Sequence, residues 1–229
     1  MDTGHPKAST PAAPGHGPHA ASRRAPRADP PTRVRHRFTK ALVGSDPSPG
    51  ELATTLACAL AGTALAVGAC LAADLPAAAT AVTAVVAFDF FGGAVATSTA
   101  AAKRRYHAPG RTLRHHTGFV ALHLQPFALA LFVPGFGWWT AAALYLFALA
   151  CAVAVGLTPL PLRAPVAFCA TATGSTAALL FLPVPDALAW LAPVMLVKLL
   201  LGHMLPGAVR ATAEGGAHGT EEGRPVGAA

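Results

Sequence analysis

The chain has 229 residues, of which 53% are hydrophobic and only 12% are charged. Soluble domains carry about 25% charged residues, so this composition excludes an ordinary soluble domain and indicates an integral membrane protein. The formal net charge is +7, but basic residues that flank apolar segments have a topological explanation. We therefore expect no nucleic-acid partner.

Residues 1–50 precede the first long apolar segment and are rich in Pro, Ala, Gly, His and Arg. They show no periodicity and too little apolar surface to form a core, so we predict a disordered tail. Residues 207–229 are predicted to form a second disordered tail. The membrane domain is then 51–206, and the sequence Asp46-Pro47-Ser48-Pro49 just before it is typical of a helix start.

Six apolar segments in this domain are long enough, or nearly so, to cross a hydrocarbon core, which needs about 20 helical residues. They run approximately over residues 52–73, 76–102, 117–133, 138–157, 164–182 and 187–205. The predicted fold is therefore all-α, a polytopic bundle of about six transmembrane helices. The third segment is the weakest, because it is short and contains His123, Gln125 and Pro126; the alternative is a re-entrant segment.

Basic residues occur in alternate connections only. With six crossings, the N-terminal tail, the connection 103–116, the connection that contains Arg163 and the C-terminal tail that contains Arg210 share one side. The opposite turns contain no Lys or Arg, so the positive-inside rule places both termini in the cytoplasm of a multi-pass protein of the plasma (inner) membrane. A re-entrant third segment would put Arg163 and Arg210 outside, and we reject it for that reason.

Asp89 lies near the middle of the second apolar segment. A carboxylate at this depth costs about 2.5–3.5 kcal/mol on insertion scales, so it usually faces a bundle interior, a partner or a water-filled cavity. Gly92 and Gly93 follow one turn later. One interpretation is a glycine notch that makes room for a substrate beside the carboxylate. The other is a glycine-mediated helix contact with Asp89 bonded to a neighbouring helix.

Lys198 in the sixth segment is the candidate partner of Asp89. An Asp89–Lys198 pair would remove two burial problems and define the packing of the second and sixth helices. Alternatively, the long side chain extends to the inner headgroups. A third interpretation is a catalytic or coupling lysine.

Three histidines are expected in the cytoplasmic half of the bundle. His116 and His123 are spaced to share one helix face, and His203 is near the end of the sixth segment. Together they could bind a divalent metal, zinc or iron, although no HExxH-type spacing occurs. A second hypothesis is acid–base work by His123 with Asp89. A third is that these histidines are solvated or hydrogen-bonded without chemistry.

The connection 103–116 holds five basic residues: Lys103, Arg104, Arg105, Arg111 and Arg114. The four arginines could bind the phosphate of a lipid headgroup. The alternative is that the loop serves topology and a general attraction to anionic lipid.

Three functional hypotheses remain open at this stage. The first is a membrane-embedded enzyme that acts on a lipid or other amphipathic substrate from the cytoplasmic side, with Asp89, His123 and Lys198 as catalytic residues. The second is a proton-coupled small-molecule transporter, and the third is a non-catalytic structural or partner protein, with a homo-oligomer as one form. The polar groups cluster in one half of the bundle, which favours the enzyme, because a transport path should be polar across both halves.

Overall fold

The structure is a computed structural model that describes Met1 and residues 47–207. This part is helical and contains no strand, which confirms the all-α prediction. The two predicted disordered tails lie outside the described residues, apart from residues 47–50 and 207 at their inner ends. Residues 49 and 50, which the sequence assigns to the tail, belong to the first described helix.

The first described helix, α2 (Pro49–Ala72), begins where the sequence predicts a helix start. Ser48 is its N-cap: the Ser48 Oγ accepts a hydrogen bond from the Glu51 N–H at 3.1 Å, and the Glu51 carboxylate accepts one from the Ser48 N–H at 2.8 Å. This reciprocal capping box satisfies two backbone donors that have no partner inside the helix. Residues 48 and 51, which are close together in the sequence, therefore define where α2 begins.

Helix α3 (Ala77–Ser98) returns antiparallel to α2 after a turn in which Asp74 has a φ of 50°. Small residues let the two helices approach closely. A Cβ on Gly92 would lie 2.9 Å from the Ala59 Cβ, and one on Gly62 would lie 2.1 Å from the Phe91 side chain. The α2–α3 pair is thus packed through glycine, as small residues in membrane helices allow.

Five helical segments are long and apolar enough to cross a membrane. They are α2, α3, α7 (Trp138–Leu157), α8 (Leu160–Phe181) and the segment Asp186–His203, which comprises η1 (Asp186–Leu188), α9 (Leu191–Leu196) and the π-helix η2 (Val197–His203). The predicted single helix over 187–205 is therefore three consecutive helical pieces. These segments indicate a multi-pass integral membrane protein in contact with lipid.

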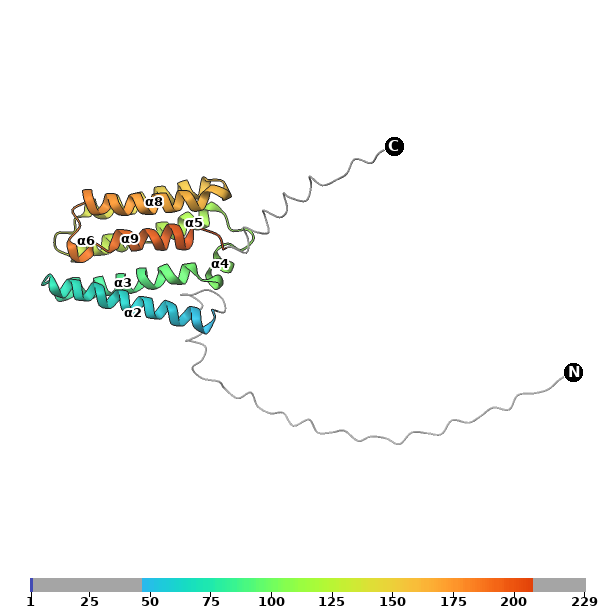
Figure 1. Cartoon of the computed structure of the whole chain (residues 1–229), viewed down its shortest axis with the longest axis horizontal. Helices are drawn as coiled ribbons and strands as arrows, with labels where there is room; N and C mark the ends of the chain where they lie inside the picture. Colours follow the sequence, from blue (N-terminus) through green and yellow to red (C-terminus); the bar gives the residue numbers. More distant parts are fainter. Residues whose placement is uncertain (2–46, 208–229) are drawn as a thin grey trace, which may run out of the picture.

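The third predicted span is not a single helix, so the prediction of one continuous helix over residues 117–133 is wrong. The chain forms α5 (Leu113–Ala121) and α6 (Gln125–Phe132), separated by a break at residues 122–124. Pro126 explains the break, because its ring lacks an N–H and would clash with the carbonyl four residues earlier in a continuous helix. Both short helices pack on α7, and the Tyr145 hydroxyl of α7 donates to the Ala121 carbonyl at the break at 3.0 Å. Figure 1 shows α5 and α6 toward opposite ends of the bundle.

The described chain enters and leaves the bundle at the same end. The short helix α4 (Ala100–Tyr106) receives contacts from both. The Ala101 N–H donates to the Glu51 carboxylate at the start of α2 at 3.2 Å, and the Lys103 ammonium donates to the carbonyls of Gly202 and Leu205 at the end of η2. The helices α5 and α6 follow one another between α4 and α7, where the sequence predicts the third span. The second span was predicted to reach residue 102, but its helix α3 ends at Ser98. Thr99 has an extended backbone, and its side chain caps the next helix, α4.

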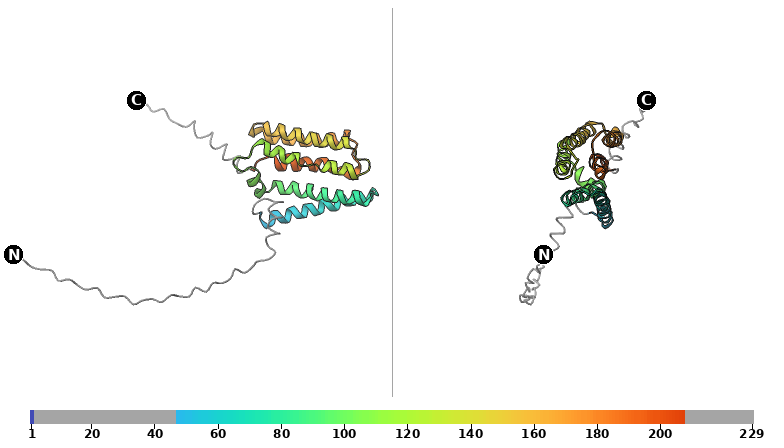
Figure 2. Two further views of the ribbon diagram at one scale, coloured as in Figure 1. Left: turned by 180° about the vertical axis from the view of Figure 1, so that it is seen from behind. Right: turned by 90° about the vertical axis from the view of Figure 1, so that its left-hand side faces the viewer.

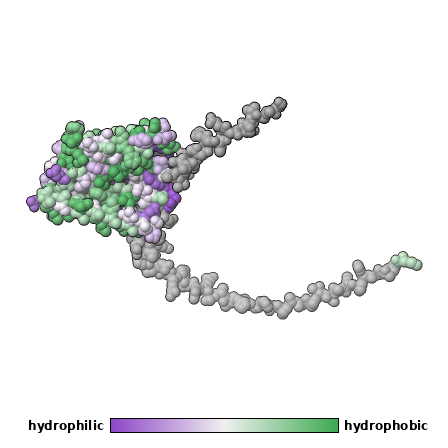
Figure 3. Space-filling model, viewed as in Figure 1, coloured by the Kyte–Doolittle hydropathy of each residue, from purple (hydrophilic) through white to green (hydrophobic). Residues whose placement is uncertain are grey.

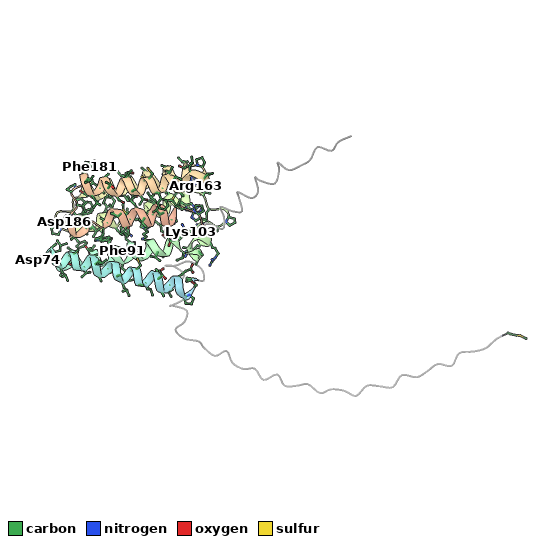
Figure 4. The ribbon with its side chains drawn as sticks, viewed as in Figure 1. Asp74, Phe91, Lys103, Arg163, Phe181 and Asp186 are labelled. Carbon is green, nitrogen blue, oxygen red and sulfur yellow. The ribbon has the colours of Figure 1, made fainter. Side chains whose placement is uncertain are left out.

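The last segment is the central one. In this segment 61% of the residues are buried, whereas in the other four long segments 22% to 33% of the residues in the most apolar stretch are buried. The end-on view in Figure 2 shows the α2–α3 pair on one side and the other helices grouped beside it. The face in Figure 3 is mostly hydrophobic along the helices and has its hydrophilic residues near the ends. Figure 4 places Lys103 and Arg163 at one end and Asp74 and Asp186 at the other.

Candidate functional site

An ion pair inside the bundle joins the two charged residues that the sequence singled out. The Lys198 Nζ lies 2.6 Å from the Asp89 Oδ2 and 3.2 Å from the Asp89 carbonyl oxygen. Lys198 comes from the π-helix η2, and Asp89 comes from the middle of α3. The Lys198 side chain is buried in the bundle, so the alternative in which it extends to the headgroups is wrong.

The broken helix supplies a third member of this site. The Gln125 Nε2, on the first residue of α6, donates to the same Asp89 Oδ2 at 3.0 Å. The Gln125 Oε1 is buried and has no partner among the described residues. A buried acceptor without a donor is costly in a low-dielectric interior. The Asp89–Lys198–Gln125 site therefore joins α3, η2 and the break before α6, and it keeps one acceptor unused.

The glycine notch beside Asp89 is filled by protein. A Cβ on Gly93 would lie 2.4 Å from the Lys198 Cε, so the missing side chain makes room for the lysine stem. Gly92 faces Ala59 of α2. The interpretation that these glycines make room for a substrate is wrong, and the alternative of a glycine-mediated helix contact holds.

His123 lies beyond the end of α5, so it does not share a continuous helix face with His116 as predicted. The His123 Nδ1 lies 2.8 Å from the Phe119 carbonyl oxygen and therefore donates to it. The His123 ring packs between aromatic neighbours, at 4.7 Å from the Phe119 ring centroid and 6.3 Å from that of Phe90. Its side chain is buried, and its charged neighbours are those of the ion pair.

The other histidines gather closer to α4. The His116 Nδ1 lies 3.3 Å from the His203 Nε2, and the His107 Nε2 donates to the His203 carbonyl at 3.1 Å. The His107 and His116 rings stack with centroids 4.7 Å apart. Of the three predicted metal ligands, the structure brings His116 and His203 together, whereas the Phe119 ring contacts both His203 and His123.

The predicted metal site does not assemble as a cluster. In the stretch from 47 to 207, no three His, Cys, Asp or Glu side chains converge in an arrangement that could hold a metal ion. A hydrogen bond between His116 and His203 satisfies the two nitrogens that meet. The set His116, His123 and His203 is thus divided into a His116–His203 pair and a separate His123.

The predicted phosphate-binding residues are all exposed. Arg104 and Arg105 lie on α4, Arg111 precedes α5, and Arg114 lies in its first turn. The Arg105 guanidinium carbon lies 6.0 Å from the centre of the Tyr106 ring. Their binding of lipid headgroup phosphate stays a prediction.

Lys103 differs from its basic neighbours because it is half-buried. Burial lowers the pKa of Lys103 to about 8, and burial also raises the pKa of Tyr106. A neutral lysine amine still has two N–H groups, which match the two carbonyls of Gly202 and Leu205 that it contacts. Lys103 thus holds the end of η2 in either protonation state.

Sequence reasoning missed three contributors to this site: Gln125 as a partner of Asp89, Phe119 and Lys103. Gln125 could have been found as a polar side chain next to the helix-breaking Pro126. Lys103 could have been separated from the arginines only by its burial. Phe119 carries no signal, because nothing in its spacing predicts contacts with two histidines from different segments.

No protein-family model matches the chain, and the searches of curated proteins and of solved structures found no significant match.

Proposed function

We propose that this chain is a proton-coupled membrane carrier of a small solute, with the Asp89–Lys198–Gln125 site as its coupling centre. One observation carries the proposal: the break between α5 and α6 lies next to an ion pair between two of the five long apolar segments, and Gln125 at that break bonds directly to Asp89. Secondary transporters place their substrate and ion sites near the bilayer midplane, where broken helices meet. A π-helix, such as the one that carries Lys198, is also frequent at functional sites.

The chemistry of coupling follows from the shared carboxylate oxygen. The Asp89 Oδ2 accepts from both Lys198 and Gln125. A proton on Asp89 removes the negative charge that attracts the Lys198 ammonium and weakens the acceptor for Gln125. Protonation therefore loosens α3 from η2 and α6 at one point, and this is the differential contact that a conformational change between two states requires.

The sequence alone favours an enzyme over a carrier. Two observations favour the carrier. The first is the helix break, which the sequence did not predict. The second is that protein fills the space at Gly92 and Gly93, where the enzyme hypothesis placed a substrate. The side of the bundle opposite α4 also contains a buried polar atom without a described partner, the Thr83 Oγ1. Polar groups are therefore not confined to one half.

The carrier is tested in liposomes that contain the purified protein and a trapped pH-sensitive dye. A pH gradient is imposed, and a panel of amino acids, sugars, organic amines and carboxylates is added singly. We expect at least one solute class to dissipate the gradient with the wild-type protein and not with Asp89→Asn, because the amide cannot take up the proton. If no solute in the panel moves protons above the rate of empty liposomes, the proposal is wrong.

A membrane enzyme is the second candidate, and the exposure of Asp89 favours it. The Asp89 side chain is 41% exposed on the surface of the bundle. An amphipathic substrate in the bilayer could reach this carboxylate from the side, with its headgroup at the four arginines of the α4 end. In the same liposomes, mass spectrometry of the extracted lipids would show a converted lipid that the Asp89→Asn preparation lacks.

We also propose six membrane crossings with both termini in the cytoplasm. One support is that the described chain enters and leaves the bundle at the same end, with α5 and α6 in series beside the five long segments. The other is the charge difference between the ends, with Lys103 and Arg163 at one and Asp74 and Asp186 at the other. In a variant with Ala at all four cysteines, single cysteines at Gly110 and at Gly137 are treated with an impermeant maleimide on intact cells. Labelling at 137 but not at 110 supports this topology, and the reverse pattern contradicts it.

A further inference from the structure

A column of rings runs from the ion pair toward the α4 end of the bundle. The Lys198 Nζ lies 5.0 Å from the centre of the Phe90 ring, and the Phe90 ring lies 6.3 Å from that of His123. The Phe119 ring follows at 4.7 Å from His123, and it stacks on His203 at 3.9 Å with an interplanar angle of 17°. Two titratable imidazoles, His123 and His203, thus each contact the same apolar ring.

The outer group of this column consists of His203, His116 and His107. His203 is buried, whereas His116 is only half-buried and lies at the basic end. The His203 Nε2 and the His116 Nδ1 are 3.3 Å apart, so one of them donates to the other. The outer group therefore connects a buried imidazole to the end of the bundle.

The hydrogen bonds define which nitrogens carry hydrogens. The His203 Nδ1 is buried and has no partner in the described part of the chain. A buried N–H without a partner is rarer than an unused acceptor, so the Nδ1 keeps its lone pair and the Nε2–H donates to the His116 Nδ1. A proton that binds the His203 Nδ1 can push the Nε2 proton to His116, which releases its own Nε2 proton to water. The reverse transfers carry a proton inward.

The inner group is His123 with the ion pair. Since the His123 Nδ1 donates to the Phe119 carbonyl, the Nε2 of neutral His123 holds the lone pair that can take a proton. The charged groups that face His123 are Lys198 and Asp89. His123 is thus connected to the coupling centre through the Phe90 ring, which lies 6.3 Å from the His123 ring and 5.0 Å from the Lys198 Nζ.

The two groups are separate because their hydrogen bonds do not join them: His203 bonds to His116, and His123 bonds to the Phe119 backbone. We propose that the Phe119 side chain is a proton barrier between His203 and His123, and that its displacement opens the proton path between the α4 end and Asp89. This inference rests on the proposed carrier and names the route of its proton. The titratable groups that face His203 are His116, His107, Lys103, His123 and Tyr106, whose ring centroid lies 4.8 Å from that of His203.

The test is proton leak in the absence of any solute. Wild-type protein, Phe119→Ala and Phe119→Leu are reconstituted in liposomes with a trapped pH dye and a potassium diffusion potential. We expect the leak of Phe119→Ala to exceed that of wild type by about tenfold, which equals a barrier lower by about 1.4 kcal/mol. Phe119→Leu keeps apolar packing and should leak at an intermediate rate, and it decides the question if the alanine variant is not recovered folded.

Two controls separate a proton path from general damage. Phe127→Ala removes a matched half-buried ring, which packs on Trp138 and Tyr145 outside the column, and it should not leak. Adding His203→Ala to either Phe119 variant should return the leak to the wild-type rate, because the outer group is then interrupted. An unchanged leak in the Phe119 variants, or a leak that persists without His203, overturns the inference.

These outcomes are independent of the carrier test. A leak through His203 in a protein that moves no solute would support the path and reject the carrier. Solute-driven proton uptake without a leak in the Phe119 variants would support the carrier and place its proton route elsewhere.

Discussion

Lys198 and Asp89 form an ion pair of 2.6 Å between unequal partners, since the lysine side chain is 4% exposed and the aspartate side chain is 41% exposed. The lysine depends on its partner more than the aspartate does. A buried charge that loses its partner carries an uncompensated desolvation cost. Without Lys198, by contrast, Asp89 keeps the hydrogen bond from the Gln125 amide. Removing Asp89 and removing Lys198 should therefore reduce the stability of the bundle by different amounts.

We predict that Asp89→Leu destabilises the bundle more than Lys198→Met. Breaking a buried pair from one side costs about 3–5 kcal/mol, and the cost falls mainly on the variant that leaves Lys198 alone. The double variant Asp89→Leu/Lys198→Met should recover most of the loss, because no charge is then buried. Thermal unfolding in detergent measures all three. Equal losses in the two single variants would show that the exposure difference has no energetic effect.

Gly93→Ala should destabilise the protein by about 1–3 kcal/mol, the usual cost of overpacking. The new methyl group would lie 2.4 Å from the Lys198 Cε, so the lysine stem must leave its groove and its contact with Asp89 weakens. Gly68→Ala is the control, because no atom lies within 4 Å of its added Cβ. In a helix that change should be neutral or stabilising. Comparable losses in both variants would contradict the role of the notch.

Glu51→Ala should cost about 1 kcal/mol more than Ser48→Ala. Loss of an N-cap side chain costs about 1 kcal/mol, and both variants lose the capping box. Glu51 additionally accepts from the Ala101 N–H, which ties the start of α2 to α4. Unfolding midpoints of the two variants measure the difference, with Thr54→Ala as a control on the same turn. A larger effect of Ser48→Ala would mean that the link to α4 contributes nothing.

Stability should rise with pH between about 8 and 10 through Lys103. The pKa of Lys103 is lowered to about 8 by burial, from 10.5 when exposed. In this window the unfolded chain binds more protons than the folded one, so raising the pH favours the folded state, on the order of 1 kcal/mol from this group. Above pH 10 the raised pKa of Tyr106 acts in the opposite direction, because the unfolded tyrosine ionises first.

The comparison of wild type with Lys103→Met checks this prediction. The difference in unfolding free energy between the two should change with pH in favour of wild type from pH 8 to pH 10. Arg104→Met, which removes an exposed basic side chain from the same helix α4, serves as the control. A difference that stays constant across this range would show that Lys103 keeps its ordinary pKa.

Much of the architecture could be predicted because it depends on local patterns. Apolar runs predicted α7 over its observed bounds, and the predicted helix start at residues 46–49 contains Ser48, the observed cap of α2. The prediction of a continuous third helix failed because a single residue within that apolar segment disrupts the helix. Pro126 breaks the third segment although its neighbours are apolar, and hydropathy carries no information about a missing N–H.

The sequence by itself determined that this is an all-helical membrane protein with charges concentrated at one end, because the absence of water requires long apolar helices whatever their arrangement. It also identified Asp89 and Lys198 as residues whose burial needs an explanation. Only the tertiary structure decided that the two pair with each other, that Lys198 fills the space at Gly93, and that His123 lies apart from His203. These are contacts between segments far apart in the chain, and they depend on helix rotation and approach, which periodic patterns on single helices do not specify.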